Sequence, residues 1–254
     1  LSWPTGCVGY SLQRDGTSRA PFSRVQELLA AAFTSWTNVD CGGALPGLDL
    51  VELAAVNCDT KGFDRNGPNA NAIIFRDETW PYSSRGILAL TTVTYGVESG
   101  QIRDADIEFN SAGIAFSYDD VDVQYDFLSI ATHEAGHFLG LAHSTVRGAT
   151  MVRDYTRGST DLRDLDADDA AGLCQVYPPR DIGACAPVPD GGLVDECGSA
   201  AEPPEEGDTP AGLSCCTVAP GHASGTHARA AGMALLCAGL VARWRRRSRA
   251  LRAP

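Results

Sequence analysis

The residues best suited to chemistry lie close together, between positions 133 and 143. His133 and His137 are four residues apart, and a helix places such residues on one face, so both imidazoles can reach one ion. Glu134 follows His133 directly and offers a carboxylate that can act as a base. Gly140 tolerates a positive φ, so the chain can turn there and bring His143 back as a third ligand. Three nitrogen ligands leave one tetrahedral position open, which is typical of a catalytic zinc.

A methionine eight residues after the last of these histidines completes a longer pattern. The pattern resembles the H-E-x-x-H-x-x-G-x-x-H motif and Met-turn of the metzincin zinc endopeptidases, carried here by His133, Glu134, His137, Gly140, His143 and Met151. Ser144 and the spacing to Met151 are most similar to the matrixin branch, peptidase M10. A chance helical motif with ordinary polar histidines is the other interpretation, and the extra residues argue against it. The resemblance implies one zinc on the three histidines, Glu134 as general base and Met151 as an apolar floor.

The elements that must position these residues follow from periodicity. A helix is predicted after residue 23, with Ser23 as N-cap, Gln26 as its capping-box partner and an apolar stripe at helical spacing that ends at Trp36. Alternation predicts strands near 8–12, 48–56, 71–75, 88–95 and 104–110, and the last of these alternates acidic with apolar residues, which indicates a sheet with one wet face. A last helix is predicted near 165–177. The order resembles the metzincin fold: an α+β domain whose mixed, twisted sheet carries two long helices above the cleft and a C-terminal helix below it.

The resemblance also implies where a substrate binds. In metzincins an edge strand pairs with an extended peptide, and the corresponding residues here are Leu88, Ala89, Leu90 and Thr91. These residues could equally form an ordinary sheet strand. The loop at 152–160 would wall the pocket for the residue after the cleaved bond, or would be a simple connection. The implied partner is a protein or peptide substrate, and we expect a monomer.

An acidic loop precedes the histidines. Asp119, Asp120 and Asp122 carry hard oxygen ligands that suit Ca²⁺, and related enzymes hold structural calcium in such loops, although a solvated turn explains the same residues. Asp126 is placed to cap the histidine helix.

Charge and cysteine content restrict the environment. Residues 1–227 carry 13 Lys and Arg against 32 Asp and Glu, whereas residues 228–254 carry seven Arg and no acid. Residues 1–227 are acidic enough to repel nucleic acid and anionic membranes, so only the tail could approach a membrane. Nine cysteines favour an oxidising compartment, and Cys41 and Cys58 are candidate partners. We expect a secreted protein whose leader was removed or lies outside these residues.

The chain divides into three parts by composition. Residues 1–178 form the catalytic domain, 179–213 a Pro-rich, Gly-rich and acidic linker, and 214–254 a tail. The tail has a Cys motif, a short apolar run at 230–242 and an Arg cluster, and it resembles the MYXO-CTERM class of bacterial sorting signals. That resemblance implies processing or lipid attachment at Cys215 or Cys216, and anchoring at the outer membrane.

The sequence thus predicts a secreted or surface-attached zinc endopeptidase. Two alternatives are a surface-displayed zinc-binding module that does not cleave, which the intact Glu134 argues against, and a zinc hydrolase of a non-peptide amide. No cysteine-switch segment occurs in these residues, so any latency of that kind lies upstream or is absent.

Overall fold

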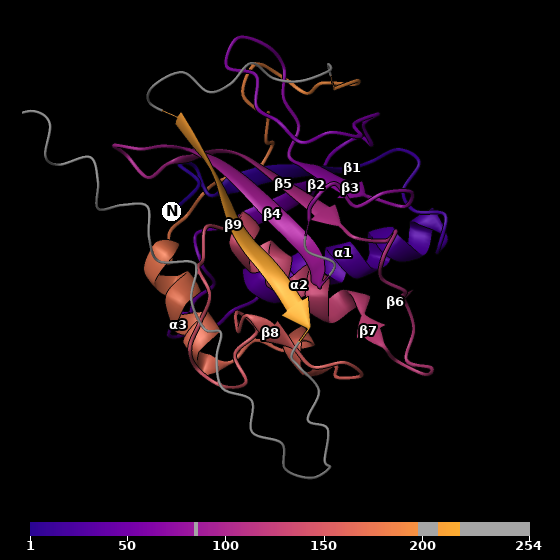
Figure 1. The fold of residues 1–254 in the computed structure, drawn as a ribbon. Helices are drawn as coiled ribbons and strands as arrows, with labels where there is room; N and C mark the ends of the chain where they lie inside the picture. The colour runs from indigo at the N-terminus through magenta and orange to yellow at the C-terminus, as the bar shows by residue number, and fades with distance from the viewer. Residues whose placement is uncertain (84–85, 198–207, 219–254) are drawn as a thin grey trace, which may run out of the picture. The chain divides into compact units, whose positions relative to one another are not determined.

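A mixed sheet of seven strands is the frame of the protein (Figure 1). The structure is a computed structural model that describes residues 1–83, 86–197 and 208–218, the last segment by its backbone. The strand order across the sheet is β2-β1-β3-β5-β4-β9-β8. The strands of this sheet are β1 (Cys7–Leu12), β2 (Asp49–Glu52), β3 (Ala72–Phe75), β4 (Ile87–Gly96), β5 (Ile102–Phe109), β8 (Asp154–Tyr155) and β9 (Asp208–Val218).

The direction of the strands changes at β4. The pairs β1–β2, β1–β3 and β3–β5 are parallel, whereas β4 runs antiparallel to β5 on one side and to β9 on the other. Strand β8 pairs with β9 in parallel. A small second sheet joins β6 (Phe116–Ser117) to β7 (Tyr125–Asp126). The expected strands are all present, although the one predicted at 48–56 is shorter.

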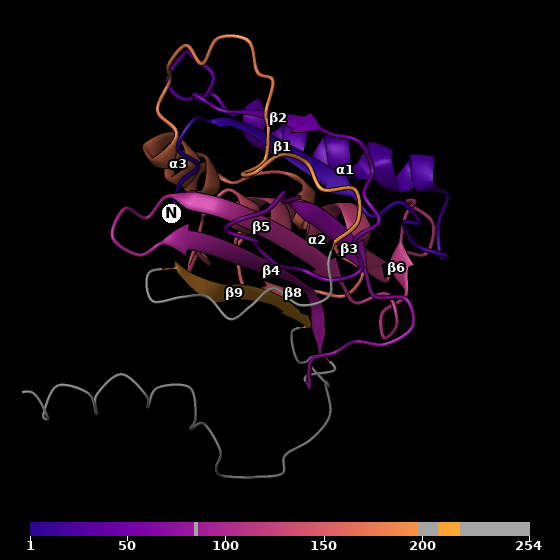
Figure 2. The same cartoon turned by 90° about the horizontal axis from the view of Figure 1, so that it is seen from above.

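Helices cover one face of this sheet (Figures 1 and 2). They are α1 (Phe22–Thr37), α2 (Phe127–Phe138) and α3 (Ala167–Val176), with a short 3₁₀ turn, η1 (Asp161–Arg163), between β8 and α3. The apolar stripe of α1 is buried, as its spacing predicts, and meets Ile107 and Phe109 of β5 and Ile130 of α2 in the main core. This arrangement confirms the predicted α+β fold.

The predicted cap of α1 is wrong. The helix begins at Phe22 after Pro21, and no side chain caps it, so Ser23 already lies inside the first turn. Gln26 instead donates a hydrogen bond to Glu52 at 2.7 Å, because the sheet brings β2 within reach of its amide. Proline at this point fixes a φ that suits a helix start, which explains the earlier beginning.

The predicted wet face of the sheet is also wrong. Asp104, Asp106 and Glu108 of β5 point away from the helices, yet each is at most 2% exposed. The loop that precedes β3 covers them, with Lys61 near Glu108 and the N–H of Gly62 donating to Asp106. For Asp106 and Glu108, protein donors therefore replace the water that the alternating pattern suggested.

Three disulfides tie distant segments together: Cys7–Cys185, Cys41–Cys174 and Cys58–Cys197. The expected pairing of Cys41 with Cys58 is therefore wrong. Cys41 packs against the main core, whereas Cys58 belongs to the small core on the opposite face of the sheet. Two of these disulfides hold residues 179–197, the first part of the expected linker, against the body of the protein.

The structure describes only a small part of the C-terminal tail. The chain divides into a unit at Leu1–Ala219 and another at Pro220–Pro254, and the second lies outside the described residues. The apolar run at 230–242 and the Arg cluster therefore lie there too. Within the described segments, every helix is too short or too polar to cross a bilayer. Strand β9 includes Cys215 and Cys216 and crosses the boundary that composition set at 213.

Candidate metal centre

Helix α2 carries the histidine motif and is fixed at its first residue. Asp126 is the N-cap, and its carboxylate accepts from the backbone N–H of Ser129 at 2.8 Å, as expected for a residue of this type. Arg163 of η1 donates to both oxygens of the same carboxylate, at 2.6 and 2.8 Å. A buried cap with a bidentate ion pair gives the helix a defined start and hence defined positions for its side chains.

Three imidazoles converge at the end of this helix. His133 and His137 are buried, and their Nε2 atoms lie 3.0 Å apart. His143, which is half-buried, completes a group in which one ligand atom of each residue lies within 4.8 Å of the others. In the described part of the chain, this is the only group of three or more His, Cys, Asp or Glu residues with that geometry. The structure therefore brings together the three residues that the sequence singled out.

Backbone carbonyls determine the tautomers of two of these rings. His133 Nδ1 lies 2.7 Å from the Thr150 oxygen, and His137 Nδ1 lies 2.8 Å from the Leu141 oxygen. A carbonyl oxygen can only accept, so each Nδ1 carries the proton and each Nε2 presents a bare lone pair. Two bare nitrogens 3.0 Å apart repel one another unless a cation lies between them. Tetrahedral zinc with Zn–N bonds of about 2.1 Å would hold two nitrogens about 3.4 Å apart, so the site fits zinc closely.

Burial also keeps the rings in their ligand form. Removal from water lowers the pKa of His133 to about 4 and that of His137 well below its ordinary value. The pKa of His143 is lowered as well, by partial burial and by the positive charge of Arg153. All three imidazoles are therefore neutral at pH 7, as metal ligation requires.

Two glycines between His133 and His143 are required by the packing. Gly140 has a φ of +88°, so the chain leaves the helix in the left-handed region and carries His143 back toward His137. Gly136 lies against the Met-turn, because a Cβ there would come 2.2 Å from Met151 Sδ and 2.7 Å from the ring of Trp36. Met151 is 2% exposed, and its side chain packs against the histidine helix at Gly136.

The general-base candidate has a partner on the neighbouring strand. Glu134 is fully buried, and the Thr91 hydroxyl of β4 donates to its Oε2 at 2.6 Å. The same hydroxyl lies 3.3 Å from the backbone oxygen of Glu134. Thr91 was predicted as a residue of the substrate strand, and its side chain has the additional role of orienting the carboxylate.

The comparisons with known proteins agree with this geometry. Residues 2–178 match the matrixin family, peptidase M10. The chain belongs to the matrixin family. Zinc is the catalytic metal of this family, and the histidine cluster fits it.

Individual matrixin relatives match over short stretches. Mouse matrilysin is 44% identical over 62 residues, which cover 24% of this chain and 24% of matrilysin. The Arabidopsis thaliana metalloendoproteinase 2-MMP is 34% identical over 93 residues, or 36% of this chain and 24% of the relative. Human neutrophil collagenase is 31% identical over 109 residues, or 41% and 22%. These matches span about a quarter of the length of each relative.

Asp169 holds the matrixin Met-turn in place, a role that the sequence did not reveal. Asp169 in the first turn of α3 is 2% exposed and accepts from the N–H groups of Thr150 and Met151, at 2.6 and 3.0 Å. Since the Thr150 carbonyl orients His133, Asp169 acts on the metal site through this turn. The capping-box position of Asp169 was the available signal, but it indicated only a helix start.

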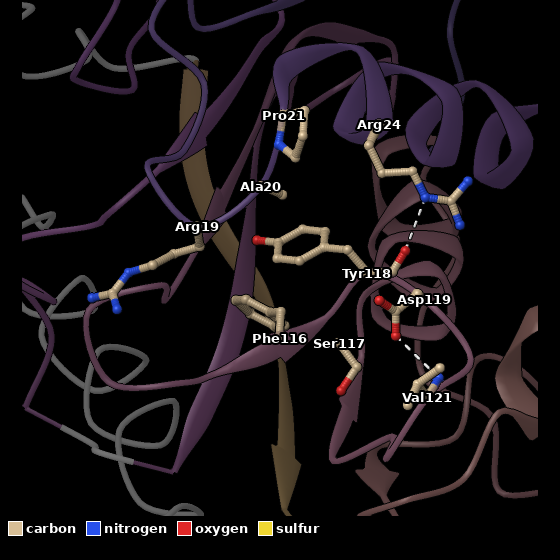
Figure 3. Close-up of a pocket in the computed structure, with 9 residues that line it drawn as sticks. All are labelled: Arg19, Ala20, Pro21, Arg24, Phe116, Ser117, Tyr118, Asp119 and Val121. Atoms are coloured by element: carbon tan, nitrogen blue, oxygen red, sulfur yellow. Dashed lines mark hydrogen bonds between the residues drawn. The ribbon is translucent and has the colours of Figure 1, made fainter.

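The acidic loop expected to bind calcium does not gather its carboxylates. Asp119 accepts from the N–H of Val121 at 3.0 Å, and Asp120 pairs with Arg163. Figure 3 shows the first of these contacts in a hollow of about 570 Å³ beside the start of α1, where Arg24 also donates to the Tyr118 carbonyl. Calcium binding by Asp119, Asp120 and Asp122 stays a prediction that this arrangement does not support.

Proposed function

We propose that this matrixin is a zinc-dependent endopeptidase that hydrolyses peptide bonds in extended substrates. The convergence of the His133, His137 and His143 nitrogens beside the carboxylate of Glu134 is the observation that carries the proposal. Matrilysin, the metalloendoproteinases and the collagenases among its relatives have names that support the same class of reaction.

Each residue has a defined part in this reaction. Bound zinc would polarise the scissile carbonyl and make water a better nucleophile near neutral pH. Glu134 accepts a proton from the attacking water and returns it to the amine nitrogen that leaves. The Thr91 hydroxyl holds the Glu134 carboxylate in one orientation, and a fixed base is worth a factor of ~10²–10⁴ in rate.

Strand β4 is the proposed binding strand for substrate. Strand β4, which contains Leu88, Ala89, Leu90 and Thr91, pairs with β5 on one side. Its other side, which pairs with β9 of the same chain in this structure, is the proposed binding side for an extended peptide. Tyr155 is not assigned to catalysis, because its buried hydroxyl accepts from the Asp126 N–H and donates to the Ser159 carbonyl.

We infer that the protein works outside the cytoplasm. Three disulfides support an oxidising compartment. Surface attachment through residues 214–254, with processing at Cys215 or Cys216, is a prediction from the sequence alone.

The test compares the wild-type chain with Glu134→Gln by zinc analysis and by cleavage-site profiling on a peptide library. We expect one zinc in both proteins and cleavage only by the wild type. Glu27→Gln is the matched control, since Glu27 lies exposed on α1 and should cleave normally. Equal cleavage by Glu134→Gln would exclude Glu134 as the base, and turnover of small acylated amides without peptide cleavage would exclude the endopeptidase.

A further inference from the structure

The side of β4 that faces away from β5 pairs with a strand of the same chain. Strand β9 runs antiparallel to β4, with Ser214 opposite Thr91 and Cys215 opposite Leu90. Its other side pairs in parallel with β8, where Thr217 faces Asp154 and Val218 faces Tyr155. Figures 1 and 2 both show β9 beside β4, and the strand order places it between β4 and β8. Residues 208–218 therefore lie where an extended substrate is proposed to bind.

The two strands that flank β9, β4 and β8, are both bonded to the histidine helix α2. On one side, the Thr91 side chain bonds to Glu134. On the other, the Tyr155 hydroxyl accepts from the N–H of Asp126, the N-cap of α2. The backbone position of Ser214, opposite Thr91, is thus aligned with the proposed base rather than with a remote part of the sheet.

The chain keeps this strand close to β4. Cys197 is joined to Cys58 by a disulfide, and only residues 198–207 separate Cys197 from β9. A tether of about ten residues gives an effective concentration on the order of millimolar, which favours binding within the chain over binding between chains. Apart from Asp208, the segment is uncharged. Because it pairs with β4, a peptide substrate would have to displace it from that strand.

We propose that residues 208–218 are a tethered inhibitory strand, which occupies the peptide groove in cis and competes with extended substrates. This inference rests on the proposed function, because the strand inhibits only if the groove binds substrate. Residues 208–218 would thus regulate the catalytic domain of the same chain.

The test uses the full chain with Gly212→Pro and Ser214→Pro together. These residues face Thr92 and Thr91 of β4, on either side of a register shift in this strand pair. Proline has no N–H group and fits poorly inside a strand, so the two substitutions should weaken the β4–β9 ladder. Ala200→Pro with Ala201→Pro is the matched control in the same tail. If β9 leaves the groove free about one-tenth of the time, apparent substrate binding by the wild type is roughly tenfold weaker. The double-proline variant should therefore have a KM lower by about that factor, with kcat unchanged.

A second readout is independent of turnover. In the Glu134→Gln background, amide hydrogen exchange of β4 should be faster in the β9 double-proline variant than in the control variant. A peptide of residues 208–218, with serine in place of both cysteines, should inhibit the active double-proline variant competitively.

The outcomes separate the two claims. Equal KM and equal β4 exchange in all variants would overturn the inhibitory strand while leaving the endopeptidase intact. Self-cleavage within 208–218 with no change of activity toward other peptides would show that the strand is only a substrate and would overturn its inhibitory role. Faster exchange with no peptide cleavage by any variant would refute the proposed function and leave occupancy of the groove standing.

Discussion

The two faces of the central sheet bury titratable side chains in different ways. On the helix side, His133 and His137 are neutral, their Nδ1 protons bond to carbonyls, and their Nε2 lone pairs point to one place. On the opposite face, Glu108 accepts from Arg76 and Tyr82, and Asp106 accepts from the N–H groups of Ala72 and Gly62. Donors of the protein thus already use the carboxylate oxygens.

Geometry explains the difference. Alternate residues of one strand are separated by about 6.6 Å, so the β5 carboxylates follow one another in a row and do not meet at a point. Residues four apart on a helix lie about 5–6 Å apart at Cβ, and a turn after the helix adds a third ligand. Burial shifts the pKa values on both faces, but only the helix side directs lone pairs to a common centre.

The largest expected effect breaks the metal side of this comparison. His137→Ala should lower zinc affinity by more than the ~10–100-fold that loss of an outer partner costs, because it removes a direct ligand. The measurement is zinc content after dialysis against a competing chelator. Asp104→Asn, on the opposite face, should retain its zinc. Retention of zinc by His137→Ala would refute the three-histidine site.

Packing under the histidine helix gives the next effect. Gly136→Ala should lower the free energy of unfolding by ~1–3 kcal/mol, since its Cβ would overlap Met151 and Trp36. Gly172→Ala in α3 is the matched control, because its Cβ meets nothing closer than 3.9 Å and should stabilise the helix by ~0.5–1 kcal/mol. Urea melts of both variants test the opposite signs, and equal signs would contradict the packing argument.

A smaller effect is expected from removing hydroxyl groups on the two faces of β4. Thr91→Val removes the hydroxyl that bonds to Glu134 and should lower kcat/KM roughly tenfold, as expected for a bond to a charged acceptor. Thr92→Val is the control, since the Thr92 hydroxyl faces Lys61 on the other side of the sheet. Peptide cleavage by both variants is the measurement, and similar losses would show that the side chain of Thr91 has no special role.

The smallest effect concerns pH on the acidic face. Burial raises the pKa of Asp106 from 3.8 to about 7, so the folded protein keeps a proton that the unfolded chain loses. Its stabilising contribution is complete below pH 3.8 and is lost as the pH rises to about 7. Asp106→Asn should make this fall shallower by on the order of 1 kcal/mol.

Urea melts at several pH values between 4 and 7 measure this change. The exposed Asp15→Asn serves as control. An unchanged slope in Asp106→Asn would mean that Asp106 does not hold the proton.

Much of the fold was predictable because it depends on local patterns. The apolar stripe of α1, the strands near 72–75 and 87–96 and the Asp126 cap all follow from periodicity and residue type. The acidic face of β5 was not predictable, since alternation cannot distinguish water from a covering loop. Disulfide partners also escaped prediction, because their separations of 133 to 178 residues carry no local signal.

The sequence by itself determined the chemistry of the site: three imidazoles at helical and turn spacing, a carboxylate beside them, and a glycine where the backbone must turn. Only the tertiary structure decided that the Thr150 and Leu141 carbonyls choose the tautomers, that Asp169 holds the Met-turn, and that β9 lies along β4. The physical reason is range. Helix and turn preferences act over a few residues, whereas hydrogen bonds between distant segments exist only once the core has brought those segments together.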